Sequence, residues 1–434
     1  MLHVTALAGA LQTLFTATAE QLASLTQFIR RRRKLTGPRF AQVLVFEWIS
    51  DPEATFETLA RKLELTPQAL DQRLTPSAWE FLKQLLRHAL QTAHHTRRQP
   101  QGLLDRFSAV IVEDATSIAL PAALAAEFPG CGGSTATQGA AALKIFLRWD
   151  LRTGEILALT AHAGRTADRH LAVEPQSLPD GSLYLADLSF FRSEHRRCFA
   201  SGTFWISRVG ADTRVNVADC WCQWSVWLRK DRVSLFDGLA LLGKTDPLVC
   251  RLIARRCPPE IAALRRRRCH ARAQKAGRGN ATALQLTSCD WQVWATNVPP
   301  SVLNTSEVDT VYRCRWQIEL FFKRAKSLGG WCVDPRRRAL RVQVELWAKL
   351  LGVVVMHWAV LLGGDLLAGA SLWKLTNVVR EYGSVLRRAL QTGGSTWLRV
   401  WNELERELAR VPKQRPSKRK PLAFQTLTPA TSTT

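Results

Sequence analysis

Three acidic residues have the types and the surroundings that could do chemistry. Asp114 ends the apolar segment AVIVED, Asp187 ends LYLAD, and Glu319 is the single acidic residue of the basic stretch YRCRWQIELFFKRAK. A carboxylate that follows a buried strand is held at the rim of a sheet, where α/β proteins commonly bind ligands. Taken singly, either aspartate also fits a simpler interpretation, the cap of a following turn. The three together favour one shared site.

Carboxylates that converge on one point repel one another, and the usual compensation is a pair of divalent cations about 4 Å apart. One metal polarises the attacking oxygen, and the other stabilises the leaving oxygen during displacement at phosphorus. Hard oxygen ligands favour Mg²⁺ or Mn²⁺ over zinc. The acidic residues therefore predict a two-metal site that acts on a phosphodiester.

The basic stretch around Glu319 has helical spacing. Tyr312, Arg315, Glu319, Lys323 and Lys326 are three or four residues apart, so on one continuous helix they share a stripe. We expect Glu319 to face the metals while its cationic neighbours bind phosphates. The alternative is a solvated helix with Arg–Glu–Lys pairs four residues apart, which we would favour if the two aspartates were absent.

The charge balance points to a polyanionic partner. The 434 residues include 60 Lys and Arg against 36 Asp and Glu, for a net charge of +24. Nucleic acid is the leading partner. An anionic membrane is disfavoured, because the chain shows no lipid-anchor signal and its apolar run at 350–364 is too short to span a bilayer. With no signal-peptide pattern and no paired C-x2-C cysteines, we expect a cytoplasmic protein with no membrane contact.

The patterning predicts several regions in order. Up to about residue 100 it is helical, with a helix-turn-helix at 55–75 in which Thr66 caps and Pro67 opens the second helix. Plain packing and DNA reading both fit that hairpin, and its basic residues Arg61, Lys62 and Arg73 favour DNA.

Strands follow the helical region. We predict strands at 107–116, 142–151, 156–164, 182–191 and 203–209, with helical stretches at 166–173 and 192–199. This order suits a ribonuclease-H-like sheet without singling it out. Beyond it, Trp-rich strands at 220–228 and 289–298 flank a very basic stretch, helices continue to about residue 408, and the tail has the composition of a disordered segment.

The pattern Y-x2-R-x3-E-x6-K, with the wording RWQIELFFKRAKSLGG, resembles the signature of the insertion-sequence-four family of bacterial DDE transposases. The stretch TNVP at 296–299 is also similar to the family, as are EDAT around Asp114 and LADLSFF around Asp187. The resemblance covers roughly residues 30–365. One departure is Leu-Ser-Phe-Phe after Asp187, where many relatives carry a small or Gly-containing turn and then an aromatic residue.

The resemblance implies an α/β ribonuclease-H-like core with a β-rich insertion, preceded by a helical N-terminal domain and followed by C-terminal helices. It also implies two Mg²⁺ ions, replaceable by Mn²⁺ and bound by Asp114, Asp187 and Glu319. Four residues would contact terminal DNA phosphates: Tyr312, Arg315, Lys323 and Lys326. Some relatives stack a flipped base on a Trp of the insertion, for which Trp291 and Trp294 are candidates, although a Trp on a strand also fits a place in the core.

The function implied is that of a transposase. It would bind the terminal inverted repeats as double-stranded DNA, cleave the ends with activated water, and join the freed 3′ ends to target DNA as a homodimer. Two alternatives stay open: a transposase-derived DNA-binding protein, and a two-metal nuclease without strand transfer. The predicted divisions are an N-terminal DNA-binding domain at 1–100, the core at 101–208 and 301–365, the insertion at 209–300, C-terminal helices at 366–412, and a basic tail at 413–434.

Overall fold

The computed structural model describes most of the chain, and it divides into two compact units. The described residues are 4–31, 34–91, 102–131, 140–172, 174–190, 199, 202–217, 219–230, 234–244, 247–275, 277, 279–328, 338–362 and 371–412. Unit 1 comprises residues 1–101, 115–166 and 316–434, and unit 2 comprises residues 102–114 and 167–315.

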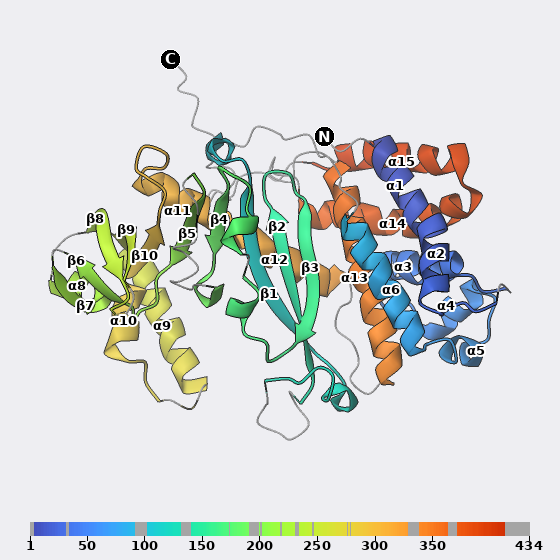
Figure 1. The fold of residues 1–434 in the computed structure, drawn as a ribbon, viewed down its shortest axis with the longest axis horizontal. Coiled ribbons are helices and arrows are strands. Elements are labelled where there is room, and N and C mark those ends of the chain that lie inside the picture. Colours follow the sequence, from blue (N-terminus) through green and yellow to red (C-terminus); the bar gives the residue numbers. More distant parts are fainter. Residues whose placement is uncertain are drawn as a thin grey trace, which may run out of the picture. The chain divides into compact units, whose positions relative to one another are not determined.

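Unit 1 is mainly helical (Figure 1). Its helices are α1 (Val4–Thr13), a π-helical turn (Leu14–Thr18), α2 (Ala19–Leu25), α3 (Gly37–Ser50), α4 (Phe56–Lys62), α5 (Pro67–Asp71), α6 (Pro76–Gln91), α12 (Trp316–Leu328), α13 (Ala339–Leu362), α14 (Leu372–Thr392) and α15 (Gly394–Ala409). The predicted helix-turn-helix is confirmed as α4 and α5. The Thr66 side chain accepts a 3.1 Å hydrogen bond from the Ala69 amide, and Pro67 is the first helical residue.

The N-terminal and C-terminal helices of unit 1 share one core. The Arg387 guanidinium of α14 donates to Glu47 of α3 at 2.7 Å, and the Trp397 indole of α15 donates to the Ala8 carbonyl of α1 at 2.7 Å. Helix α13 is long and apolar enough to cross a membrane, but the whole of its apolar window is buried within the protein. Such complete burial is typical of the core helix of a protein domain.

A β-hairpin adds strands to unit 1. Strands β2 (Ala142–Asp150) and β3 (Ile156–Ala163) pair antiparallel, and the sheet order continues from β2 to β1 (Val110–Ala119), which begins in unit 2 and ends in unit 1. His357 of the buried α13 places its Nε2 atom 2.6 Å from the Gly154 carbonyl at the hairpin turn. This contact ties the helical core to the hairpin.

Unit 2 contains the rest of the sheet. From β1 its order is β1-β4-β5-β10-β9-β8-β6-β7. The first three strands run parallel and the remaining pairings are antiparallel. The elements are β4 (Leu183–Ala186), β5 (Phe204–Arg208), β6 (Arg214–Val217), β7 (Cys220–Gln223), α8 (Trp224–Lys230), β8 (Leu235–Leu242), β9 (Leu248–Arg256), α9 (Pro259–Lys275), α10 (Ala283–Cys289), β10 (Trp291–Thr296) and α11 (Thr305–Arg313).

The molecule is thus a mixed α/β protein with a large sheet, as predicted, but several local predictions were wrong. The strand expected at 182–191 ends at Ala186, and Leu188–Phe190 is a 3₁₀ turn. Asp114, expected to end its strand, lies inside β1, which continues to Ala119.

The strand expected at 220–228 becomes a helix at Trp224, because Trp224 and Leu228 recur at helical spacing and are both buried. The helix expected at 166–173 is only a 3₁₀ turn, Asp168–His170. The continuous helix expected through 312–326 is interrupted between α11 and α12. The predicted tail, and the 192–198 part of the helix expected at 192–199, lie outside the described residues.

Candidate active site at the ends of two parallel strands

The pairing of β1 with β4 brings two carboxylates to equivalent positions. Val110 lies opposite Leu183, and Val112 lies opposite Leu185. This offset of 73 residues (183 − 110) equals the separation of Asp114 from Asp187 (187 − 114 = 73). Asp114 lies two residues after Val112, within β1, and Asp187 lies two residues after Leu185, just past the end of β4. The two aspartates therefore follow the paired segment of the strands at equivalent positions.

One guanidinium lies beside both carboxylates. Arg315 Nη1 is 3.9 Å from Asp114 Oδ2, and its Nη2 is 4.0 Å from Asp187 Oδ1. These distances exceed hydrogen-bonding range, so the interaction is a through-space attraction that offsets the repulsion between the aspartates. Asp187 has 41% of its side chain exposed and Asp114 21%, so both remain accessible to a ligand.

The end of α11 positions Arg315. Hydrogen bonds from Cys314 N to Val311 O at 3.0 Å and from Arg315 N to Tyr312 O at 3.1 Å tighten the chain into a turn. The Tyr312 hydroxyl donates to the Ala186 carbonyl at 3.1 Å, next to Asp187. Burial raises the pKa of Tyr312 to about 12, so this hydroxyl stays protonated as a donor. Tyr312 therefore fixes α11 to the end of β4.

The burial of Tyr312 differs from the phosphate contact expected for it. Only 8% of this residue is exposed, and its hydroxyl already has a carbonyl partner within unit 2. The expectation assumed one continuous helix with a solvent-facing stripe. The turn at 314–315 breaks that stripe and directs Tyr312 into the protein.

Residues that the sequence did not single out anchor α11 at its start. The Asn304 side chain accepts from the Ser306 and Glu307 amides, and Glu307 reaches back to the Asn304 amide at 2.8 Å, which completes a capping box. Arg106 makes an ion pair with Glu307 at 2.9 Å, and Arg255 makes one with Asp309 at 2.5 Å. The Asn-x-x-Glu spacing is a sequence pattern from which the helix cap could have been predicted. The two arginine partners could not, because they are distant from α11 in the sequence.

The TNVP stretch connects the end of β10 to β5. Thr296 Oγ1 donates to the Trp205 carbonyl at 2.5 Å, and the Trp205 amide donates to Asn297 Oδ1 at 2.8 Å. Asn297 Nδ2 also donates to the Thr203 carbonyl at 2.8 Å. These bonds satisfy backbone groups where the strands end, so the stretch supports the sheet next to β4.

The tryptophans expected as a base-stacking platform are in the core of unit 2. Trp291 is 5% exposed and Trp294 1%, both on β10. The guanidinium carbons of Arg208 and Arg255 lie 5.6 Å and 5.7 Å from the Trp294 ring centroid. This burial is what the core interpretation of the two strand residues predicts.

Glu319, Lys323 and Lys326 belong to α12 of unit 1. Glu319 is half-buried in the first turn, where the helix dipole favours a negative charge. The Lys323 ammonium lies 4.8 Å from the centroid of the exposed Trp316 ring, and Lys326 Nζ donates to the Ser117 carbonyl of β1 at 3.3 Å. Lys323 is exposed, whereas Lys326 is half-buried.

The donor set of unit 2 suits a hard divalent cation. Asp114 and Asp187 supply carboxylate oxygens, the ligands that Mg²⁺ and Mn²⁺ prefer. Among the described residues, no three His, Cys, Asp or Glu side chains gather as a metal cluster. Unit 2 therefore offers a pair of carboxylates with a guanidinium beside it.

The sequence was compared with known families. The family model "Transposase DDE domain" matches residues 105–354, more than half of the chain. The chain belongs to the DDE transposase family. This confirms the resemblance that the glutamate and aspartate motifs indicated, and the matched range contains Asp114, Asp187 and Glu319.

Individual transposases are similar over most of their length. The chain is 24% identical to the transposase for insertion sequence element IS231B of Bacillus thuringiensis subsp. berliner, over 86% of this chain and 84% of the relative. It is 26% identical to the transposase for insertion sequence element IS1151 of Clostridium perfringens, over 77% and 76% of the two chains.

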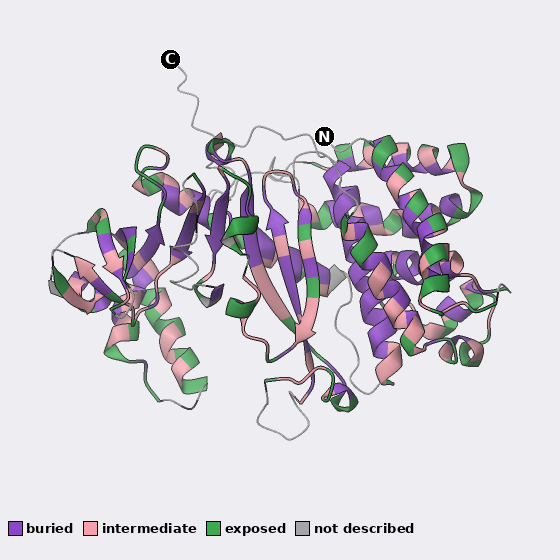
Figure 2. Ribbon diagram, in the orientation of Figure 1, coloured by how far each residue is buried: buried purple, intermediate pink, exposed green. Residues whose placement is uncertain are grey.

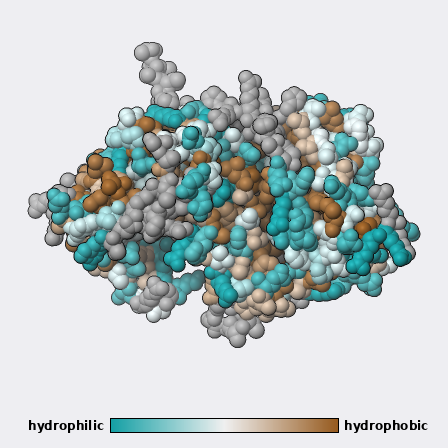
Figure 3. All heavy atoms as spheres, in the orientation of Figure 1, coloured by the Kyte–Doolittle hydropathy of each residue, from teal (hydrophilic) through white to brown (hydrophobic). Residues whose placement is uncertain are grey.

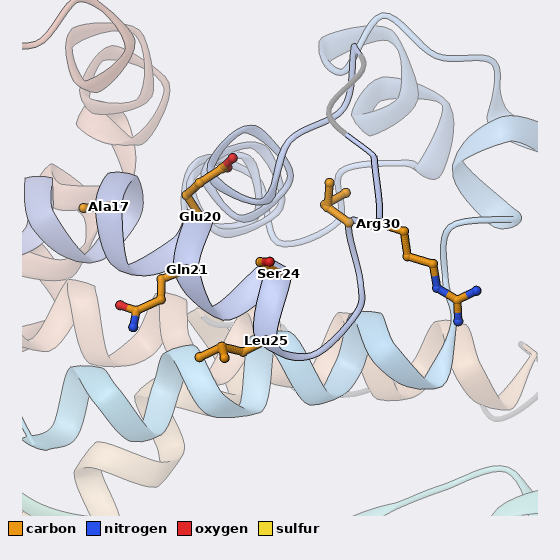
Figure 4. Close-up of a pocket in the computed structure, with 7 residues that line it drawn as sticks. Ala17, Glu20, Gln21, Ser24, Leu25 and Arg30 are labelled. Atoms are coloured by element: carbon orange, nitrogen blue, oxygen red, sulfur yellow. The ribbon is translucent and has the colours of Figure 1, made fainter.

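This DDE transposase also has a pocket in its helical unit, of about 540 Å³, beside α2. Figure 4 shows its lining of mostly small or uncharged side chains, with Glu20 and Arg30 as the charged members. None of the predicted site residues lines it. The pocket is separate from the aspartate pair.

Proposed function

We propose that this DDE transposase binds the terminal inverted repeats of a bacterial insertion sequence, cleaves the DNA there, and joins the 3′ ends to target DNA. The observation that carries the proposal is that Asp114, within β1, and Asp187, just after β4, both lie beside the Arg315 guanidinium. A binding protein would gain nothing from two carboxylates next to phosphates, because like charges repel.

A ribonuclease-H-like core is supported by the strand order. The order is β3-β2-β1 in unit 1 and β1-β4-β5 in unit 2, with β2 antiparallel to β3 and with β4 and β5 parallel to β1. In this arrangement Asp114 lies within the central strand β1, and Asp187 directly follows its neighbour β4. A carboxyl edge built in this way holds catalytic carboxylates rigidly.

We propose that Asp114, Asp187 and Glu319 hold two Mg²⁺ ions, or Mn²⁺ in their place. When bound, such ions activate the attacking oxygen and neutralise charge on the leaving oxygen. Glu319 is assigned from its motif position, four residues after Arg315. Asp114 and Asp187 orient their oxygens through the paired strand ends, and Tyr312 secures the end of β4 by its bond to Ala186.

The cations of the signature have separate tasks in this proposal. Arg315 offsets the charge of the aspartate pair and presents its guanidinium to the phosphate that is cut. Lys323 and Lys326 bind neighbouring phosphates of the terminal DNA. Cutting two ends and joining them to one target needs two active sites, so the working form is a homodimer on DNA in the bacterial cytoplasm.

The test is a cleavage and joining assay with a duplex that carries the element's own end. We expect Mg²⁺-dependent cleavage to a 3′-hydroxyl, followed by covalent transfer of that end into a plasmid. Cleavage without transfer, even from pre-cleaved ends, would instead support the nuclease alternative. Binding with neither reaction would support the DNA-binding alternative.

A further inference from the structure

Helix α9 carries a dense positive charge away from the aspartate pair. Its 17 residues include four consecutive arginines (Arg265–Arg268), then Arg272 and Lys275, against the single acid Glu260. Ala262 is its one buried residue, and in Figure 2 the helix is mostly pink and green. In Figure 3 the region where Figure 1 places α9 is largely teal and white.

Two of the arginines make hydrogen bonds or an ion pair with other residues of unit 2. Arg265 donates to the Trp291 carbonyl at 2.9 Å and to the Ser288 carbonyl at 3.3 Å. Arg266 makes an ion pair with Asp290 at 2.5 Å. These bonds fasten α9 to α10 and to the start of β10, so the helix is a fixed part of the fold.

The other four cations take no part in these bonds. Arg267, Arg268, Arg272 and Lys275 are exposed, and none makes an ion pair with another described residue. Arg268, Arg272 and Lys275 lie at positions i, i+4 and i+7, which form a stripe about 10 Å long. Like charges at this spacing destabilise a helix by a few tenths of a kcal/mol per pair. An external polyanion would remove that cost.

We propose that this stripe, Arg268, Arg272 and Lys275, together with the adjacent exposed Arg267, binds the phosphate backbone of duplex DNA without regard to sequence. The identification of DNA as the polyanion rests on the proposed function. The stripe consists of charged heads on long side chains, which suit phosphates more than base edges. It sets how tightly DNA is held, while Asp114 and Asp187 act on the DNA once it is held.

The test compares two variants of the full chain. One, the stripe variant, replaces Arg267 and the three stripe residues with Gln, which keeps helix propensity. The control is Arg266→Gln with Asp290→Asn, which leaves the net charge unchanged. Fluorescence anisotropy gives Kd between 50 and 200 mM KCl for a duplex with the element's end and for an unrelated duplex. Circular dichroism checks that both variants fold.

We expect the stripe variant to lower the slope of log Kd against log salt by about 3 to 4, near 0.9 per lost phosphate contact, equally on both duplexes. The control should keep the wild-type slope. An unchanged slope, a loss confined to the element's end, or a loss of binding to anionic vesicles without loss on DNA would overturn the proposal. Cleavage at saturating DNA is scored separately, so a protein that never cleaves refutes the proposed function and leaves the slope result standing.

Discussion

The aspartate pair and helix α9 show two ways in which unit 2 uses charge. At the aspartates, three charged groups are half-buried, and strand register and a hydrogen-bonded turn fix their positions. On α9, four cations are exposed, and only the helical repeat sets their spacing. Charged groups proposed for chemistry are thus positioned by long-range strand pairing and hydrogen bonds. Charged groups proposed to bind a polyanion need only be numerous and close together on the surface. The first should be sensitive to single substitutions and the second only to several.

The largest expected effect is at the aspartates. Asp114→Asn or Asp187→Asn should lower the rate of end cleavage by about 10³-fold or more, because losing a ligand removes several kcal/mol of transition-state stabilisation. Affinity for DNA should not fall, since a negative charge near phosphates has been removed. The measurement is single-turnover cleavage at saturating DNA, together with Kd. Equal losses of binding and of cleavage would contradict the division between the two regions.

A smaller effect is expected at Arg315. In the DNA-free protein, Arg315→Gln should tighten Mn²⁺ binding by roughly fivefold, about 1 kcal/mol, because the guanidinium near both aspartates opposes a second cation. The same variant should cleave more slowly, since a phosphate contact is lost. Titration calorimetry gives the metal affinity. The control is Arg313→Gln, which removes an exposed charge two residues away. Weaker Mn²⁺ binding by the Arg315 variant would contradict the proposed electrostatic effect of Arg315 on the aspartates.

The smallest expected effect is at Tyr312. Tyr312→Phe removes one hydrogen bond to Ala186 and leaves a buried carbonyl without this donor, so unfolding free energy should fall by about 1 kcal/mol. Cleavage should fall by less than about tenfold, because Asp187 keeps its strand. Thermal unfolding and cleavage rates are compared with Tyr382→Phe, whose hydroxyl donates to Glu403 on an exposed surface at 3.1 Å. A large drop in DNA affinity in the Tyr312 variant would instead support the expected contact between Tyr312 and a DNA phosphate.

Local sequence patterns predicted many of the elements of the fold. Apolar segments indicated β1 to β5 and β10, and Thr66 and Pro67 marked the start of α5. The motifs indicated the family, and the sequence predicted that Asp114 and Asp187 act at one site. Their equal register could not be read from the sequence, because a gap of 73 residues has no meaning until β1 and β4 are known to pair.

Long-range contacts explain the features that the sequence did not predict. Tyr312 is buried, and its hydroxyl donates to the carbonyl of Ala186, which lies 126 residues earlier in the chain. Helix α11 ends at Arg313 in a turn closed by the bond from Cys314 N to Val311 O. The Trp-rich segment at 220–228 has high strand propensity, but burial of Trp224 and Leu228 on one helical face overrides it. Trp294 similarly lies in the core between two arginines that come from other strands.

The most direct test of the central claim is to count bound Mn²⁺ by electron paramagnetic resonance on the complex with a pre-cleaved DNA end. Wild type is compared with Asp187→Asn and with Glu319→Gln. We predict two ions per active site in the wild type and fewer in each variant, with DNA occupancy unchanged. Full Mn²⁺ occupancy in either variant would show that its carboxylate is not a metal ligand, and full occupancy in Asp187→Asn would contradict the role given to the paired strand ends.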